Sequence, residues 1–166
     1  MLHGQGPDRD PEAPFMLIRR KPQGLYCEVG DFFIDPSKGV DRAVITHAHA
    51  DHARRGSRHY LCASPCEALL KIRLGKTKTI ESIPYGEKRN IHGVEVSFHP
   101  AGHILGSSQV RLEYKGEIWV VSGDYKLQKD PLAHLSNPSN PITSSLNALL
   151  ARPFISGQIH KDNGTD

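Results

Sequence analysis

A dense group of potential metal ligands occurs in the motif Thr-His-Ala-His-Ala-Asp-His at 46–52. The motif directly follows the apolar run 43–45, which is typical of a β-strand. Neutral imidazole is the commonest protein ligand of transition metals, and a carboxylate is a harder companion ligand. We therefore interpret the motif as a metal site, and its density favours two ions. The alternative is a solvated polar loop that happens to carry histidines.

Two later loops each carry one further candidate ligand. His103 lies in the glycine-containing loop 100–108, and Asp124 lies in the loop 122–125. Functional groups are often found on loops that a rigid scaffold holds. The alternatives are a turn histidine and a turn-forming aspartate. Asp35, which precedes Pro36, is either a turn cap or an anchor that hydrogen-bonds the histidine motif.

A dinuclear hydrolytic centre would divide these candidates into ligands of a first ion, ligands of a second ion and a bridging carboxylate. The first ion would be bound by His47, His49 and His103, and the second by Asp51 and His52. Asp124 would be the bridging carboxylate. A water molecule between ions about 3.5–4 Å apart loses a proton near neutral pH, and the hydroxide can act as the nucleophile. We expect Asp51 and Asp124 to be the catalytic residues of such a centre.

The elements that must position these ligands are short strands and one helix. Strands are expected at 25–29, 32–34, 42–46, 60–63, 79–83, 88–91, 94–99, 109–114 and 117–121. Gly30-Asp31 and Lys115-Gly116 are predicted to form tight turns between neighbouring strands. The helix is predicted to begin with a capping box of Ser64 and Glu67, and to end at Gly75.

Composition sets wider limits on the class of protein. The chain has 166 residues, enough for one domain, and its formal charge of +3 permits a nucleic-acid partner without requiring one. The three cysteines have no disulfide-framework spacing, so we expect buried thiols rather than a zinc pair at Cys62 and Cys66. The sequence has no apolar run of membrane-spanning length. We expect a cytoplasmic protein with a disordered leader at 1–14.

Three motifs together resemble the metallo-β-lactamase superfamily. They are the histidine motif at 46–52, Pro-Ala-Gly-His-x-Leu-Gly-Ser at 100–107 and Ser-Gly-Asp-Tyr-Lys at 122–126. The second motif is similar to that of the nucleic-acid-cutting β-CASP branch. Within that branch, the segments 24–27, 30–35 and 40–43 resemble bacterial ligase-associated DNA exonucleases.

The resemblance implies an α+β fold, the αββα sandwich, with two zinc ions and phosphodiester hydrolysis. It supports the division of ligands given above, with Asp124 as the bridge and Asp35 as the anchor of the ligand loop. It further implies DNA as substrate, with RNA as an alternative, and an ATP-dependent DNA ligase as partner. No membrane partner is expected, because the sequence has no apolar run of membrane-spanning length.

The resemblance covers about residues 22–131. The β-CASP insert, the second half of the sandwich and a final metal-binding histidine of the family are not recognisable, although His134 and His160 are candidates for the missing ligand. We therefore expect the N-terminal half of the domain at 15–131 and a poorly ordered tail at 132–166. The second zinc should be weakly held, and apolar surface should be exposed.

The leading hypothesis is a zinc-dependent nuclease of the DNA exonuclease type, active in DNA repair. The alternatives are another hydrolase of the superfamily, acting on a thioester, a lactam or RNA, and a truncated fragment without activity. Four cations near the ligand motifs either contact phosphates or form a solvated face. They are Arg54, Arg55, Arg58 and Lys126.

Overall fold

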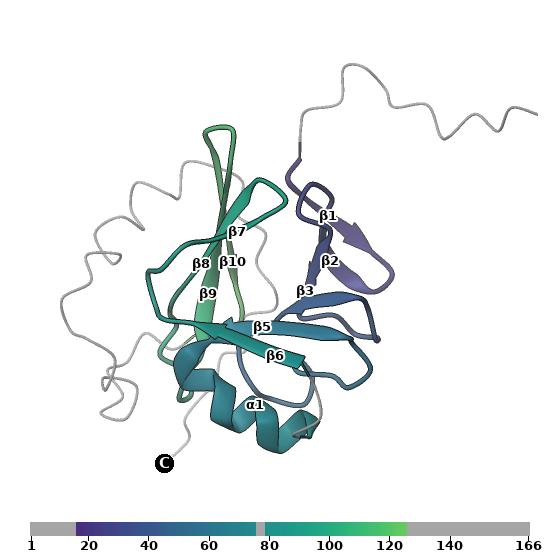
Figure 1. Ribbon diagram of the computed structural model, residues 1–166, viewed down its shortest axis with the longest axis vertical. Coiled ribbons are helices and arrows are strands. Elements are labelled where there is room, and N and C mark those ends of the chain that lie inside the picture. Colours follow the sequence, from purple (N-terminus) through teal and green to yellow (C-terminus); the bar gives the residue numbers. More distant parts are fainter. Residues whose placement is uncertain (1–15, 76–78, 126–166) are drawn as a thin grey trace, which may run out of the picture.

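The structure is a computed structural model, and it describes residues 16–75 and 79–125. Two β-sheets and one α-helix make up this part of the chain (Figure 1). The first sheet contains, in spatial order, β1 (Ile18–Lys21), β2 (Gly24–Cys27), β3 (Phe32–Ile34), β4 (Arg42–Val44), β5 (His59–Ala63) and β6 (Thr79–Ile83). The second contains β10 (Glu117–Ser122), β9 (Ser108–Tyr114), β8 (Val94–Pro100) and β7 (Arg89–Ile91).

The first sheet combines antiparallel hairpins with parallel strands. The pairs β1–β2 and β2–β3 are antiparallel, and the turn around Gly30-Asp31 is confirmed, with Cys27 paired to Phe32 across it. From β3 to β6 the strands are parallel. Because parallel strands end at the same edge of a sheet, the segments after β3 and β4 start side by side. These segments carry Asp35 and the histidine motif.

The second sheet is antiparallel throughout, and its strand ends complete the same edge. β8 pairs with β9 up to Pro100 and Ser108, and β9 pairs with β10 up to Ser122. The loop with His103 and the segment with Asp124 therefore leave this sheet at one end. The tight turn at Lys115-Gly116 is also confirmed, and both residues have a positive φ, 48° and 82°.

An apolar core fills the space between the two sheets. The first sheet contributes side chains such as Ile34 and Val44, and the second contributes Phe98 and Leu112, all of them buried. A second apolar cluster on the outer face of the first sheet holds the helix α1 (Glu67–Leu74) through its buried residues Leu70 and Leu74. The described part of the chain thus has three layers: helix, sheet and sheet.

The predicted capping box at the start of the helix is wrong. Ser64–Cys66 forms a turn of 3-10 helix, and α1 begins after Cys66 without a side-chain cap. The carboxylate of Glu67 instead pairs with Lys71 and accepts a hydrogen bond from the hydroxyl of Ser82 on the neighbouring β6. A tertiary partner has replaced the local one. The predicted stop at Gly75 is confirmed, with a φ of 95°.

The predicted α+β class is confirmed by the two sheets and the helix. Residues 16–75 and 79–125 have no helix on the outer face of the second sheet, so the second helical layer of the expected sandwich is not found among them. All three cysteines are buried and free, as predicted. The predicted leader at 1–14 and tail at 132–166 lie outside the described residues. No helix in the described ranges is long and apolar enough to cross a membrane.

Candidate metal centre

Thr46 is the point at which both sheets hold the histidine motif. Its backbone N–H donates to Asp35 Oδ1 at 2.8 Å, and its hydroxyl donates to Asp35 Oδ2 at 2.6 Å. From the second sheet, the N–H and the hydroxyl of Ser108 both donate to the Thr46 carbonyl at 2.9 Å. The first residue of the motif is therefore fixed before any ligand is bound.

This anchoring determines the tautomer of His47. The Thr46 hydroxyl gives its only proton to Asp35, so at 3.1 Å from His47 Nδ1 it must accept a hydrogen bond from that nitrogen. Nε2 of His47 is then the unprotonated nitrogen. It is buried and has no hydrogen-bond partner within the described residues. Burial, followed by the neighbouring imidazoles, lowers the pKa of His47 to about 3, so the ring is neutral and ready to bind a metal.

Nε2 of His47 belongs to a cluster of four ligand atoms that lie within 4.8 Å of one another, supplied by His47, His49, His103 and Asp124. His103 Nε2 lies 3.3 Å from His49 Nδ1 and 3.5 Å from Asp124 Oδ2. His47 Nε2 lies 3.8 Å from the same carboxylate oxygen. Two ligands at Zn–N distances of about 2.0–2.1 Å in a tetrahedron would be about 3.3 Å apart. These separations therefore fit a divalent metal ion at the centre of the cluster.

His52 belongs to a second group on the other side of Asp124. Its Nδ1 donates to Asp35 Oδ2 at 2.7 Å, which directs Nε2 towards Asp51 Oδ2 at 3.5 Å and Asp124 Oδ1 at 3.6 Å. Burial lowers the pKa of His52, but the hydrogen bond and charge of Asp35, with the charges of Asp124 and Asp51, outweigh it. The pKa of His52 is therefore raised.

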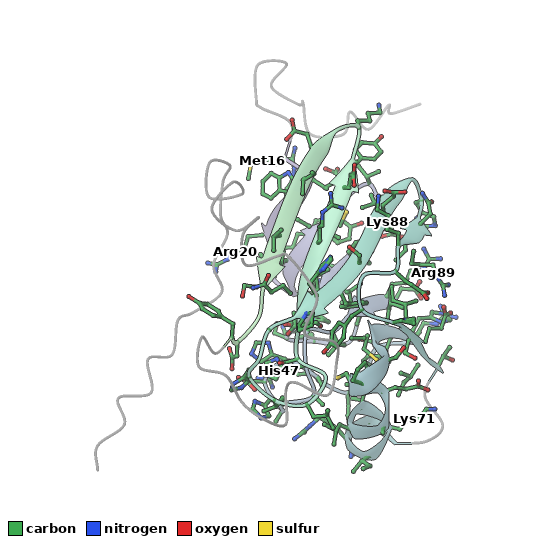
Figure 2. All side chains as sticks on the ribbon, turned by 90° about the vertical axis from the view of Figure 1, so that its left-hand side faces the viewer. Met16, Arg20, His47, Lys71, Lys88 and Arg89 are labelled. Atoms are coloured by element: carbon green, nitrogen blue, oxygen red, sulfur yellow. The ribbon has the colours of Figure 1, made fainter. Side chains whose placement is uncertain are left out.

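Asp124 thus presents one carboxylate oxygen to each group. Oδ2 faces His47 and His103, whereas Oδ1 faces His52. A carboxylate in this position can join two metal ions or, without them, hold two imidazoles. The structure brings together every ligand candidate of the histidine motif with both outlying candidates. In Figure 2 the labelled His47 lies at the lower end of the molecule, where the loops leave the sheets.

Two close backbone approaches hold the outlying ligands, and sequence reasoning did not identify them. A Cβ atom at Gly123 would lie 2.4 Å from Thr46 Oγ1, so only glycine lets the segment before Asp124 pack on Thr46. A Cβ atom at Gly106 would lie 2.4 Å from the Cys66 nitrogen. Ser107 closes the loop, because its hydroxyl accepts the N–H of His103 at 3.0 Å. The glycines were visible in the motifs, but their neighbours are distant in sequence.

The predicted phosphate contacts lie on the surface, and Arg58 lies at the start of β5, at the edge of the sheet opposite the centre. Arg54, Arg55 and Arg58 are all exposed. The Arg55 guanidinium donates to the Arg73 carbonyl at 2.9 and 3.1 Å, and Arg58 pairs with Asp41 at 3.4 Å. Lys126, His134 and His160 lie outside the described residues.

Comparison with curated proteins finds relatives that share the region of these motifs. A protein described as a probable DNA ligase of Opitutus terrae is 32% identical over 109 residues, which are 64% of this chain and 10% of the relative. An RNase J-like protein of Methanocaldococcus jannaschii is 30% identical over 122 residues, 61% of this chain and 29% of the relative. The chain therefore spans less than a third of the length of either relative.

Among solved structures, a metallo-β-lactamase of Cronobacter sakazakii aligns with a TM-score of 0.47 and 12% identity. The alignment covers 81% of this chain and 65% of the lactamase. No family model matches the chain.

Proposed function

We propose that this chain is the metal-binding N-terminal part of a zinc-dependent phosphodiester hydrolase of the metallo-β-lactamase superfamily. The observation that carries the proposal is the position of Asp124, whose two oxygens face separate groups of ligands. The RNase J-like and ligase relatives support nucleic acid as the substrate class. We assign the chain to the β-CASP branch and to DNA exonucleases, because its motifs resemble theirs. The relative from Opitutus terrae is described as a probable DNA ligase, which supports DNA as the substrate.

The proposed ligands of the first zinc are His47, His49 and His103, and those of the second are Asp51 and His52, with Asp124 as the bridge. When bound, the ions would supply Lewis-acid stabilisation and lower the pKa of water. The protein's own part is to hold these groups in position. Asp35 orients His52, and the Thr46 hydroxyl orients His47.

The electrostatics of Asp51 also suit this role. Burial raises the pKa of Asp51, but a hydrogen bond within its own residue and the neighbouring histidines lower it by more. The carboxylate is therefore ionised at neutral pH. Its side chain is 69% exposed, so it is within reach of an incoming substrate. We propose Asp51 and Asp124 as the catalytic carboxylates on this basis.

The surface around the centre suits a polyanion with apolar parts. The exposed cations Arg54 and Arg55 directly follow the histidine motif, and Arg58 lies farther away at the start of β5. We propose that all three contact phosphates of a long substrate. Leu105 and Tyr125, 49% and 38% exposed, are close in sequence to His103 and Asp124 and can contact sugar or base. We propose DNA repair in the cytoplasm, beside an ATP-dependent DNA ligase, as the setting of this activity.

A nuclease assay on the full chain tests the proposal. Labelled single- and double-stranded DNA, RNA, a thioester and a β-lactam are incubated with the protein and zinc. We expect zinc-dependent release of nucleotides from DNA, abolished by a chelator and by His49→Ala. His99→Gln, which changes a histidine outside the centre, should retain the activity.

Three results would contradict the proposal in different ways. Cleavage that survives both the chelator and His49→Ala would show that the centre is not responsible. Hydrolysis of only the thioester or the lactam would favour another hydrolase of the superfamily. Zinc binding without any hydrolysis would favour the inactive-fragment alternative.

A further inference from the structure

The loop 48–55 contains three of the proposed metal ligands, His49, Asp51 and His52. The N–H groups of His52 and Ala53 donate to the His49 carbonyl at 3.3 and 2.8 Å, which folds the loop into a single turn. A turn of this kind fixes the shape of the loop, but not its position relative to the two sheets. Contacts from outside the loop must therefore hold its ligands in place.

Arg73, in the last turn of α1, supplies the contact at the start of this loop. Its Nε donates to the Ala48 carbonyl at 2.8 Å, across 25 positions of the chain. A hydrogen bond from a charged donor is roughly twice as strong as one between neutral groups. The Ala48 carbonyl belongs to the peptide group that leads into His49. The bond therefore fixes the backbone between His47 and His49, two proposed ligands of the first ion.

Arg55 supplies the contact at the end of the loop. Its guanidinium donates twice to the Arg73 carbonyl, from Nε at 3.1 Å and from a terminal nitrogen at 2.9 Å. The last carbonyls of a helix have no partner within the helix, and basic side chains often bind them. The Arg73 carbonyl is one of these, since α1 ends at Leu74. Helix and loop are therefore bonded in both directions, once at each end of the loop.

The helix that receives these bonds is itself fixed to the first sheet. Leu70 and Leu74 of α1 are buried in the apolar cluster on the outer face of that sheet, and Ala48 and Ala53 belong to the same cluster. Figure 1 shows α1 below β5 and β6. The loop thus packs on the helix through its alanines, between the two arginine contacts.

We propose that Arg55 and Arg73 are positioning residues of the metal centre, which hold the loop 48–55 against the end of α1 and so set where its three ligands lie. The inference rests on the proposed metal centre, but not on hydrolysis or on the kind of nucleic acid. It adds a second role to Arg55, because a guanidinium has five N–H donors and the Arg73 carbonyl uses only two of those in Arg55. The others remain available to a phosphate.

Zinc titration of the metal-free full chain against a competing chelator tests the role of Arg73. Arg73→Met keeps the aliphatic stem and loses every donor, so we expect it to bind zinc about tenfold more weakly. Lys71→Met, the matched control, removes a cation from the same turn of α1 and should leave zinc affinity unchanged. Arg19→Gln, which removes an exposed arginine from β1, should also leave it unchanged. Arg73→Lys, with one charged donor, should recover part of the affinity.

Arg55→Lys tests the other end of the loop. It keeps the charge but replaces two donors in a plane by a single ammonium group. We therefore expect zinc affinity to fall severalfold, while the salt dependence of DNA binding stays as in the wild-type chain. If Arg73→Met does not unfold as a folded chain does on heating, Arg55→Lys provides the same test.

The absorption spectrum of the cobalt-loaded chain separates positioning from a general loss of stability, because it reports the arrangement of the ligands. It should change in Arg73→Met and stay the same in Lys71→Met. Zinc affinities and spectra of Arg73→Met and Arg55→Lys equal to those of Lys71→Met would overturn the inference, although the wild-type chain binds zinc. A wild-type chain that binds no zinc would instead overturn the metal centre, and the inference with it.

Discussion

Asp35 accepts hydrogen bonds from Thr46 and from His52, and so connects the strand β3 to both ligand groups. Its position directly after β3 makes this connection possible, because β3 and β4 are parallel neighbours. A residue that binds no metal thus fixes the ring nitrogen that His52 presents. Partners of this kind typically contribute a factor of about 10–100 in metal affinity.

We predict that Asp35→Asn weakens the second zinc site by about 10–100-fold, because the amide nitrogen cannot accept the hydrogen bonds of the carboxylate. Zinc titration of the variant measures the effect. Asp31→Asn, which changes an exposed carboxylate on the β2–β3 turn, is the matched control. Equal zinc affinities for the two variants would contradict the anchoring role.

The protonation of His47 leads to a prediction on pH. Its pKa is about 3 in the folded chain, against 6.5 for an ordinary histidine, so between these values the unfolded chain binds the extra proton. Stability of the metal-free chain should therefore fall as pH falls through this window, by up to about 1.4 kcal/mol per pH unit from this group. Chemical denaturation from pH 7 to pH 4 should show a shallower dependence for His47→Gln. An identical dependence would contradict a neutral, buried ring.

At the scale of the elements, the centre is assembled from the ends of strands in both sheets. Asp35 and the histidine motif follow strands of the first sheet, and His103 and Asp124 follow strands of the second. Ser108 joins the two sheets at Thr46, and Gly123 lets the last segment approach the same residue. The separation of the two ligand groups therefore depends on how closely the sheets pack at this edge.

We predict that Gly123→Ala lowers zinc affinity by about tenfold or more, because the added Cβ would displace Asp124 from between the two groups. Gly116→Ala, in the turn between β9 and β10, makes the same chemical change where no neighbouring atom lies within 4 Å. Because the φ of Gly116 is 82°, this control should lower stability but leave zinc affinity unchanged. Zinc titration and thermal unfolding separate a loss of affinity from a loss of fold. Unchanged affinity in Gly123→Ala would contradict the requirement for close packing.

The pattern of neighbouring residues in the sequence predicted many of the turns, strands and helix ends. The tight turn at Lys115-Gly116, the helix stop at Gly75 and the strand at 79–83 are where the sequence indicated. The predicted capping box of Ser64 and Glu67 does not form, because the Glu67 carboxylate accepts a hydrogen bond from Ser82 on the strand β6 instead. Pairings of that kind join residues distant in the chain, and a local pattern carries no information about them.

At the scale of the whole molecule, the sequence indicated which residues meet and offered Asp35 as an anchor, but it did not indicate the contacts from the second sheet that hold them together. The ligand candidates are histidines and aspartates that lie in recognisable short motifs, so the motifs alone identified them. Ser108, which bonds Thr46 across 62 positions, is an ordinary serine in sequence.

The surface next to the centre leads to a prediction on DNA binding. Arg54 and Arg55 are exposed directly after the histidine motif. Replacing both by glutamine should flatten the dependence of log affinity on log salt by about 0.9 per lost phosphate contact. Fluorescence anisotropy with labelled DNA at several salt concentrations measures the slope. A slope equal to that of Arg19→Gln would show that these cations are only a solvated face.

Zinc titration of the metal-free chain against a competing chelator tests most directly whether Asp124 joins a two-ion centre. We predict one tightly bound zinc and a second bound at least about tenfold more weakly. Asp124→Asn should weaken both sites, whereas His52→Ala should weaken only the second. Two equally tight ions would contradict the incomplete second site, and a chain that binds no zinc would contradict the centre itself.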